Sequence, residues 1–298
     1  MPESRLFAVI VSLVFASGAS AAPGAERGLR FNSARVLDLA NRSLQIEGGK
    51  PLAVSELSDD EAQRIFAAPA IGEDPLPLAF SDEVFGCKKA SRKCSRVNER
   101  TLLARDASVA KRDDEHLTIT PANGNAVTFV DWTEPTTKTA DGDGETHWYL
   151  GRMAGSGYAR VEVEFGHDAP GNFLINLQSG KTSFVHNAAD VAAPSPDGKY
   201  LVTFNTLNAP LSIRLATLDA DGPRLTLQCQ APEEAQRLTP VFKGWQDPLN
   251  FGLVIEIGEQ SKSMPRLALS VSGNGGIWRL EASDLARLAN TGFHCSAN

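Results

Sequence analysis

Three histidines and a neighbouring aspartate are the side chains of this 298-residue sequence whose types and spacing could do chemistry. His147, His167 and His186 follow one another at intervals of 20 and 19 residues, so on successive strands their imidazoles could converge on a zinc ion. Together with Asp168, the first two would be the residues to test in a hydrolase. Histidines in strands are more often hydrogen-bonded or solvent-exposed, and the sequence does not fix the register of these three. We therefore predict neither a metal nor another cofactor.

Other catalytic patterns are incomplete. Ser108 and Lys111 have the S-x-x-K spacing of penicillin-binding enzymes, but the K-T-G and S-D-N partners of that motif are missing. Residues 141–145 read DGDGE, like the start of a calcium loop, yet Arg152 stands where an EF-hand needs its glutamate. The sequence also contains no G-x-S-x-G, H-E-x-x-H or P-loop motif. These observations favour a protein without catalytic residues.

Four cysteines predict two disulfides if the chain is exported to an oxidising compartment. Cys87 and Cys94 are seven residues apart with polar residues between them, so we expect them to pair locally. That pairing leaves Cys229 to bond with Cys295, which would fasten the C-terminus to a strand ending near Cys229. Two other connectivities exist, and reduced metal-bound thiolates are a further alternative that the missing C-x-x-C spacing disfavours.

The first residues predict export. Arg5 precedes a short apolar run over residues 6–15, and Ala19-Ser20-Ala21 has the small-residue pattern of a cleavage site. The alternative, a membrane anchor, needs about 20 apolar residues and is not met here or elsewhere in the sequence. We expect residues 1–21 to be a secretory signal peptide, residues 22–35 a flexible entry, and the mature protein to be periplasmic or secreted.

One basic segment stands out in an acidic chain. The formal net charge is −7 and the pI is about 5.3, which makes a nucleic-acid partner improbable. Six positive charges nevertheless fall between residues 88 and 100: Lys88, Lys89, Arg92, Lys93, Arg96 and Arg100. An acidic surface of a protein partner would be attracted to this segment. The alternative is a solvated loop tip closed by its own disulfide, and under both interpretations the segment is expected to be a loop.

The middle of the chain has the most regular β pattern. Residues 173–177 form a short apolar run, and Ser179-Gly180-Lys181 supplies a turn into a second strand over residues 182–185. Pro194 then precedes Ser195-Pro196-Asp197-Gly198-Lys199, in which Asp-Gly is a strong hairpin turn. Residues 200–204 (YLVTF) have the β-branched and aromatic composition of a strand.

This strand–turn–strand pattern resembles the TolB/WD40-like β-propeller repeat over residues 173–204. The resemblance implies four-stranded blades arranged around an axis, which protects the strand edges. Ten or more short strands with turns between them extend across the rest of the chain, with few short helices. Two helices are predicted, one after Ser58 with Glu61 in a capping box, the other over residues 283–289.

We therefore predict an all-β protein in which residues 36–298 form a single, irregular β-propeller-like domain of about five blades. A β-sandwich is the alternative architecture. The predicted function is an exported, non-enzymatic protein-binding module, such as an inhibitor or immunity protein for a periplasmic enzyme or toxin. The alternatives are a hydrolase on a propeller scaffold with a metal near the central channel, and a structural component of a periplasmic assembly.

Overall fold

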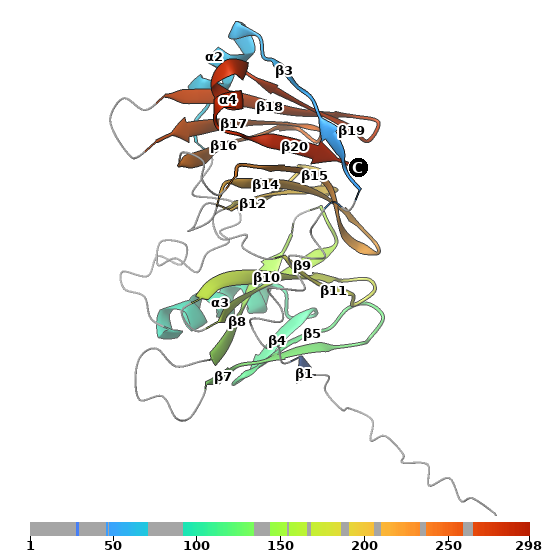
Figure 1. Cartoon of the computed structure of the whole chain (residues 1–298). Helices are drawn as coiled ribbons and strands as arrows, with labels where there is room; N and C mark the ends of the chain where they lie inside the picture. The colour runs from blue at the N-terminus through green and yellow to red at the C-terminus, as the bar shows by residue number, and fades with distance from the viewer. Residues whose placement is uncertain are drawn as a thin grey trace, which may run out of the picture.

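A computed structural model of the chain confirms the all-β class (Figure 1). It describes residues 28–29, 46, 48–70, 92–133, 144–153, 155–165, 168–185, 191–205, 210–232, 237–258 and 265–298. Within these residues the strands form four separate sheets, and none of the sheets closes on itself. The three described helices are α2 (Asp59–Ala67), α3 (Arg92–Arg105) and α4 (Leu285–Asn290).

The four sheets follow the order of the chain except for β2 (Lys50–Leu52), β3 (Val54–Glu56) and β20 (His294–Ala297), which join the third and fourth sheets from distant parts of the sequence. The first sheet has the order β1-β6-β5-β4: β1 Gly28–Leu29, β4 Ala110–Asp113, β5 His116–Ile119 and β6 Val127–Val130. The second has the order β11-β10-β9-β8-β7: β7 Trp132–Thr133, β8 Gly144–Arg152, β9 Tyr158–Phe165, β10 Asp168–Asn176 and β11 Thr182–Val185.

The third sheet has the order β12-β13-β14-β15-β20-β2: β2 Lys50–Leu52, β12 Val191–Pro194, β13 Tyr200–Asn205, β14 Ser212–Asp219, β15 Gly222–Gln230 and β20 His294–Ala297. The fourth has the order β16-β17-β18-β19-β3: β3 Val54–Glu56, β16 Leu238–Asp247, β17 Asn250–Ile257, β18 Arg266–Asn274 and β19 Ile277–Ala282.

The sheets lie one on another in sequence order, with the fourth at the top of Figure 1 and the first at the bottom. Phe129 of the first sheet packs against Phe173 of the second, with ring centroids 5.1 Å apart. Leu174 on the opposite face of the second sheet packs with Leu201 of the third. Each sheet therefore buries a face against the sheet that follows it in the chain.

The interface between the third and fourth sheets contains the largest hydrophobic cluster, and we call it the apolar interface. Phe204 of β13 lies 5.7 Å from Phe242 of β16 between ring centroids, and Leu253 of β17 is fully buried beside them. Burying apolar surface stabilises a fold by about 25 cal/mol per Å², so such a cluster is the main source of folding free energy.

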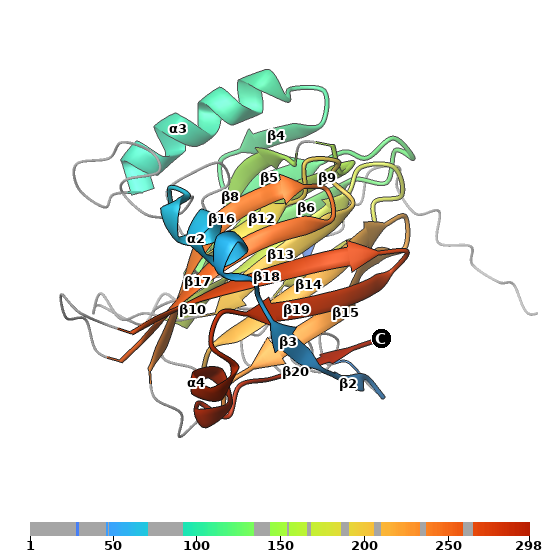
Figure 2. The same ribbon diagram turned by 90° about the horizontal axis from the view of Figure 1, so that it is seen from above.

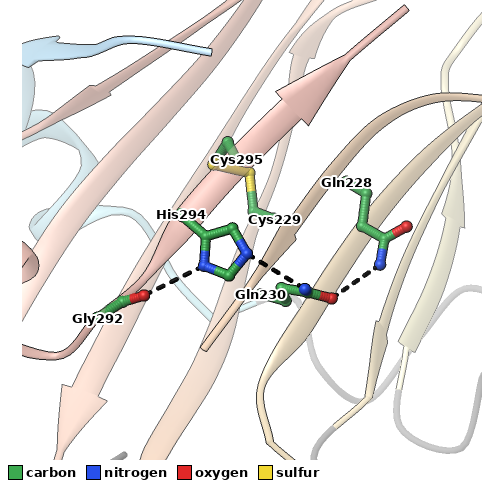
Figure 3. The surroundings of a disulfide bond; sticks show 6 residues. All are labelled: Gln228, Cys229, Gln230, Gly292, His294 and Cys295. Atoms are coloured by element: carbon green, nitrogen blue, oxygen red, sulfur yellow. Dashed lines mark hydrogen bonds between the residues drawn. A yellow bond between two sulfur atoms is a disulfide. The ribbon is translucent and has the colours of Figure 1, made fainter. Parts of the chain in front are cut away.

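Strands from distant parts of the chain complete the third and fourth sheets, with β2 and β20 in the third and β3 in the fourth. Strand β20 returns from the fourth sheet and pairs with β15, and the predicted disulfide between Cys229 and Cys295 is confirmed at that pair, with an S–S distance of 2.05 Å. Beside the disulfide, His294 Nε2 lies 3.2 Å from Gln230 Nε2, and Gln228 donates to Gln230 Oε1 (Figure 3). The disulfide thus fastens the last strand where the sequence analysis placed it.

Helix α2 covers the outer face of the fourth sheet (Figure 2). Ser58 caps it as predicted, because its hydroxyl accepts a hydrogen bond from the Glu61 amide at 3.3 Å. The Glu61 carboxylate accepts a hydrogen bond from Arg64, and Ile65 packs against Val254 of β17. The second predicted helix is confirmed as α4.

The predicted turn at residues 195–199 is also confirmed. The Asp197 carboxylate accepts hydrogen bonds from the Ser195 hydroxyl at 2.7 Å and from the Lys199 amide at 3.2 Å. Gly198 has φ +69°, and a Cβ there would lie 2.2 Å from the carbonyl carbon of Gly155 in the second sheet. Glycine is therefore required at this turn both for its backbone conformation and for the close approach of two sheets.

Two local expectations were wrong. The basic segment was expected to be a loop, but from Arg92 onward it is the helix α3. Residues 133–146 are polar and carry no core signal, which predicts a long exposed loop, but strand β8 begins at Gly144 and Glu145 is buried. In both cases buried charged residues, which hydrophobic periodicity does not detect, occupy the inner face of the element.

Candidate protein-binding surface around helix α3

Helix α3 is fastened to the second sheet by a buried glutamate. Glu99 is 1% exposed, and its carboxylate accepts two hydrogen bonds from Arg112 of β4, at 2.9 and 3.0 Å. The same carboxylate accepts the backbone amide of Tyr149 in β8 at 2.8 Å. A bidentate arginine–carboxylate pair is among the strongest polar contacts in proteins, so Glu99 holds α3, β4 and β8 in one arrangement.

Asp131 extends this contact to His147. The Asp131 carboxylate accepts the backbone amide of His147 at 2.8 Å and lies 3.2 Å from Nδ1 of the same residue. It also accepts a hydrogen bond from Arg112 at 3.4 Å. His147 is fully buried, and its ring centroid lies 5.3 Å from that of Phe129. The predicted candidate His147 therefore has a structural environment between the first two sheets.

A third carboxylate fixes the C-terminal end of α3. Asp106 accepts hydrogen bonds from the Tyr149 hydroxyl at 2.9 Å and from Arg105 at 3.0 Å. Burial by itself would raise the pKa of Asp106, but hydrogen bonds from Arg105, Tyr149 and the Arg152 backbone lower it. Burial and the neighbouring carboxylate raise the pKa of the Tyr149 hydroxyl. Asp106 therefore stays ionised while Tyr149 stays neutral.

A polar pocket of about 430 Å³ opens beside this end of the helix. Arg105, Asp106 and Arg152 line it, with the hairpin between β8 and β9 forming the rest of its wall. The Arg105 guanidinium lies over Gly151, where a Cβ would be 2.6 Å from Nη2 and where φ is +93°. Glycine at this position lets the arginine lie flat against the β8 backbone.

The exposed positive charges around α3 form what we call the basic surface, whose described side chains are Arg100, Arg105 and Arg152. Arg105 has 57% of its side chain exposed although it pairs with Asp106. In the described part of the chain, neither Arg100 nor Arg152 has a salt bridge to an acidic side chain. Two exposed guanidinium groups are therefore available, Arg100 on α3 and Arg152 at the end of β8.

The predicted binding residues fall partly on this helix. The backbone at Arg92, Lys93 and Arg96 belongs to α3, and the helical repeat places positions 92, 96 and 100 along one side of it. The side chains of Arg92, Lys93 and Arg96, and the whole of Lys88 and Lys89, lie outside the described residues. Figure 2 shows α3 at the edge of the molecule, next to β4 and far from α4.

Several other predicted residues also lie outside the described set. Cys87, the side chain of Cys94 and therefore their pairing are among them, as are His167, His186 and the side chain of Asp168. Residues 1–21 and 22–35 are described only at Gly28–Leu29, which pair in parallel with β6. The described residues contain no group of three or more His, Cys, Asp or Glu side chains that could hold a metal ion.

The sequence analysis missed the contact between Glu99 and Arg112 and the contact between Asp106 and Tyr149. Their separation in the chain gives no local signal, because the contact between Glu99 and Arg112 joins a helix to a strand of another layer. The only available hint was the presence of acidic residues at intervals in a segment that is otherwise basic.

No protein-family model matches the chain, and no curated protein matches it. Among the described residues, the structure has no helix with the length and apolar character that crossing a membrane requires.

Proposed function

We propose that this protein is an exported binding module that presents its basic surface to an acidic surface of a protein partner, such as a periplasmic enzyme or toxin that it inhibits. The observation that carries the proposal is the attachment of α3. Buried Glu99 and Asp106 fasten the helix from its inner side, while Arg100, Arg105 and Arg152 remain exposed around it. A rigid helix loses little conformational freedom on binding, which increases the affinity available from each contact.

Charge distribution supports the same proposal. The whole chain has a net charge of −7, so a concentrated positive region differs in sign from the rest of the molecule. Such a region accelerates the encounter with an acidic partner and disfavours neutral or basic ones. Because the interaction is electrostatic, its association rate should fall as the salt concentration rises.

The finer architecture is part of the proposal. Three consecutive sheets each contain four consecutive antiparallel strands, β8–β11, β12–β15 and β16–β19, which supports blades of an irregular TolB/WD40-like propeller. The Cys229–Cys295 disulfide supports an oxidising compartment, consistent with removal of residues 1–21 on export. N-terminal sequencing of the periplasmic protein should then begin at Ala22, and retention of Met1 would contradict export by this route.

Charge reversal tests the binding surface. The variant with Arg100→Glu and Arg152→Glu changes two exposed side chains without touching the buried carboxylates. A protein captured by the wild-type chain from periplasmic extract should bind this variant at least tenfold more weakly. The control variant carries Arg237→Glu, just before β16, and Arg279→Glu, in β19. Both arginines are exposed, and the control should bind as tightly as the wild type. Equal capture by both variants would remove the basic surface from the binding site.

A further inference from the structure

The interface between the second and third sheets differs along its length, and we call it the mixed interface. At one end, a small apolar cluster brings Met153, Tyr158 and Leu174 of the second sheet against Leu201 and Leu218 of the third. The β8–β9 and β14–β15 turns lie at this end, where the Tyr158 hydroxyl donates to the backbone oxygen of Asp219.

The other end of the mixed interface is polar. Strand register places Asn172 beside Glu162 in the second sheet, two residues from the apolar cluster at Leu174. In the third sheet, Arg214 pairs with Thr203, again two residues from the cluster at Leu201. Side chains alternate between the faces of a strand, so these residues point away from the hydrophobic clusters on the outer sides of the two sheets.

That alternation is confirmed by the neighbours of each residue. Phe173 beside Asn172 faces the first sheet, while Ile213 and Leu215 on either side of Arg214 face the fourth. Asn172 therefore faces the third sheet, and Arg214 faces the second sheet, across the mixed interface. Packed sheets lie about 10 Å apart, a distance at which their side chains and a ligand of a few atoms meet.

Three residues on these two facing surfaces, Asn172, Ser212 and Arg214, have polar atoms without hydrogen-bond partners in the described part of the chain. Asn172 is 2% exposed, and both its amide nitrogen and its amide oxygen lack a partner. Ser212 is 8% exposed, and its hydroxyl has no hydrogen-bond partner. Nε of Arg214 also lacks a partner. Nearly all buried polar groups in proteins are hydrogen-bonded, so a cluster of exceptions on facing surfaces indicates a ligand or solvent site.

The charge of the cluster indicates which ligand fits. Burial lowers the pKa of Arg214, and no neighbouring acid opposes that effect. Arg214 is half-buried with its Nε buried and unpartnered, and a guanidinium presents parallel donors that match the oxygens of a carboxylate or phosphate. The amide nitrogen of Asn172 and the hydroxyl of Ser212 add two further donors for such oxygens.

We propose that the polar half of the mixed interface binds a small oxyanion, a carboxylate or phosphate group, through Arg214, Asn172 and Ser212. The site is separate from the basic surface, since it lies between two sheets on the opposite face of the second sheet from α3. It does not depend on the proposed protein-binding function.

Titration with simple anions tests the site. Sodium acetate and inorganic phosphate would be added separately to the full chain at constant ionic strength, with chloride as the reference anion, while the melting temperature is measured. We expect a saturable rise with at least one of the two oxyanions, because a ligand that binds only the folded state stabilises it. The preferred anion identifies the carboxylate or the phosphate as the recognised group.

Variants separate specific binding from general salt effects. Arg214→Met and Asn172→Leu should each remove the saturable response or weaken the apparent affinity at least tenfold. Arg224→Met is the matched control on the same sheet, because 65% of the Arg224 side chain is exposed and it should leave the response unchanged. A wild-type protein that shows no saturable response to either oxyanion, or an identical response in Arg214→Met, would overturn the proposal.

Discussion

The two faces of the third sheet are buried in different ways. Against the fourth sheet it contributes to a continuous hydrophobic cluster that includes Phe204, Leu253 and the Cys229–Cys295 disulfide. Against the second sheet it has a smaller cluster around Leu201 and a polar region around Arg214. One sheet therefore has one face that is well suited to stability and another that includes groups with a cost in stability.

The difference between the two faces of the third sheet indicates that one face stabilises the fold and the other serves function. A buried polar group without a partner costs about 1–3 kcal/mol, so such groups persist where they serve a purpose other than packing. The charged residues that fasten α3 are different, because Glu99 and Arg112 form a two-bond pair and each has a further hydrogen-bond partner. Burial of charge thus positions the basic surface in one place and leaves a ligand site in another.

The largest expected effect concerns the disulfide in the apolar interface. Replacing Cys229 and Cys295 together by alanine should lower the free energy of unfolding by about 4 kcal/mol, because the bond closes a loop with a sequence separation of 66. Urea unfolding of the variant and of the wild type measures the difference. A loss below 1 kcal/mol would mean that β20 is held by its strand pairing alone.

A cavity in the apolar interface should be almost as damaging. Leu253 is fully buried, so Leu253→Ala should cost about 3 kcal/mol through lost packing and the remaining cavity. Ile277 is 69% exposed, and Ile277→Ala should change stability by less than about 0.5 kcal/mol. Similar losses for both substitutions, measured by urea unfolding, would show that the apolar interface is not tightly packed.

Breaking the attachment of α3 should have a moderate effect. Glu99→Gln removes the charge that Arg112 faces and should cost about 2 kcal/mol, since Asp131 still contacts the arginine. Hydrogen exchange should accelerate in α3 more than in the fourth sheet. If exchange in α3 is unchanged, the helix is held by its apolar contacts and not by Glu99.

Alkaline pH should weaken the same region. Because the folded-state pKa of Tyr149 is raised above the usual value of about 10, its stabilisation is present below pH 10 and lost as the pH rises further. The wild type should therefore lose roughly 1 kcal/mol more than Tyr149→Phe between pH 9 and pH 11. Parallel pH profiles of the two proteins would show that Tyr149 is not buried as the structure describes.

The sequence predicts the β class and several local features for physical reasons. The Asp-Gly turn at residues 197–198 and the Ser58 cap depend on neighbouring residues, and both are confirmed. The Cys229–Cys295 bond followed from pairing the two nearest cysteines first. Helix α3 was missed because its inner face is partly charged, and the partners of Glu99 include Arg112 and the Tyr149 amide, which are distant in the sequence.

The candidate sites were harder to predict than the fold. His147 attracted attention as a possible catalytic residue, but its imidazole and backbone amide both face Asp131 in a buried contact. Arg214 and Asn172 gave no signal, because a polar residue in an alternating strand usually faces solvent. Only the stacking of the sheets shows that this face is covered.

The most direct test is the free energy of unfolding of Arg214→Met in a buffer without carboxylate or phosphate. If the polar half of the mixed interface is a ligand site, removing a half-buried, desolvated charge that has no acid beside it should stabilise the ligand-free protein by about 1 kcal/mol. A loss of 1 kcal/mol or more would show that Arg214 supports the fold, and would contradict the distinction between the two faces of the third sheet.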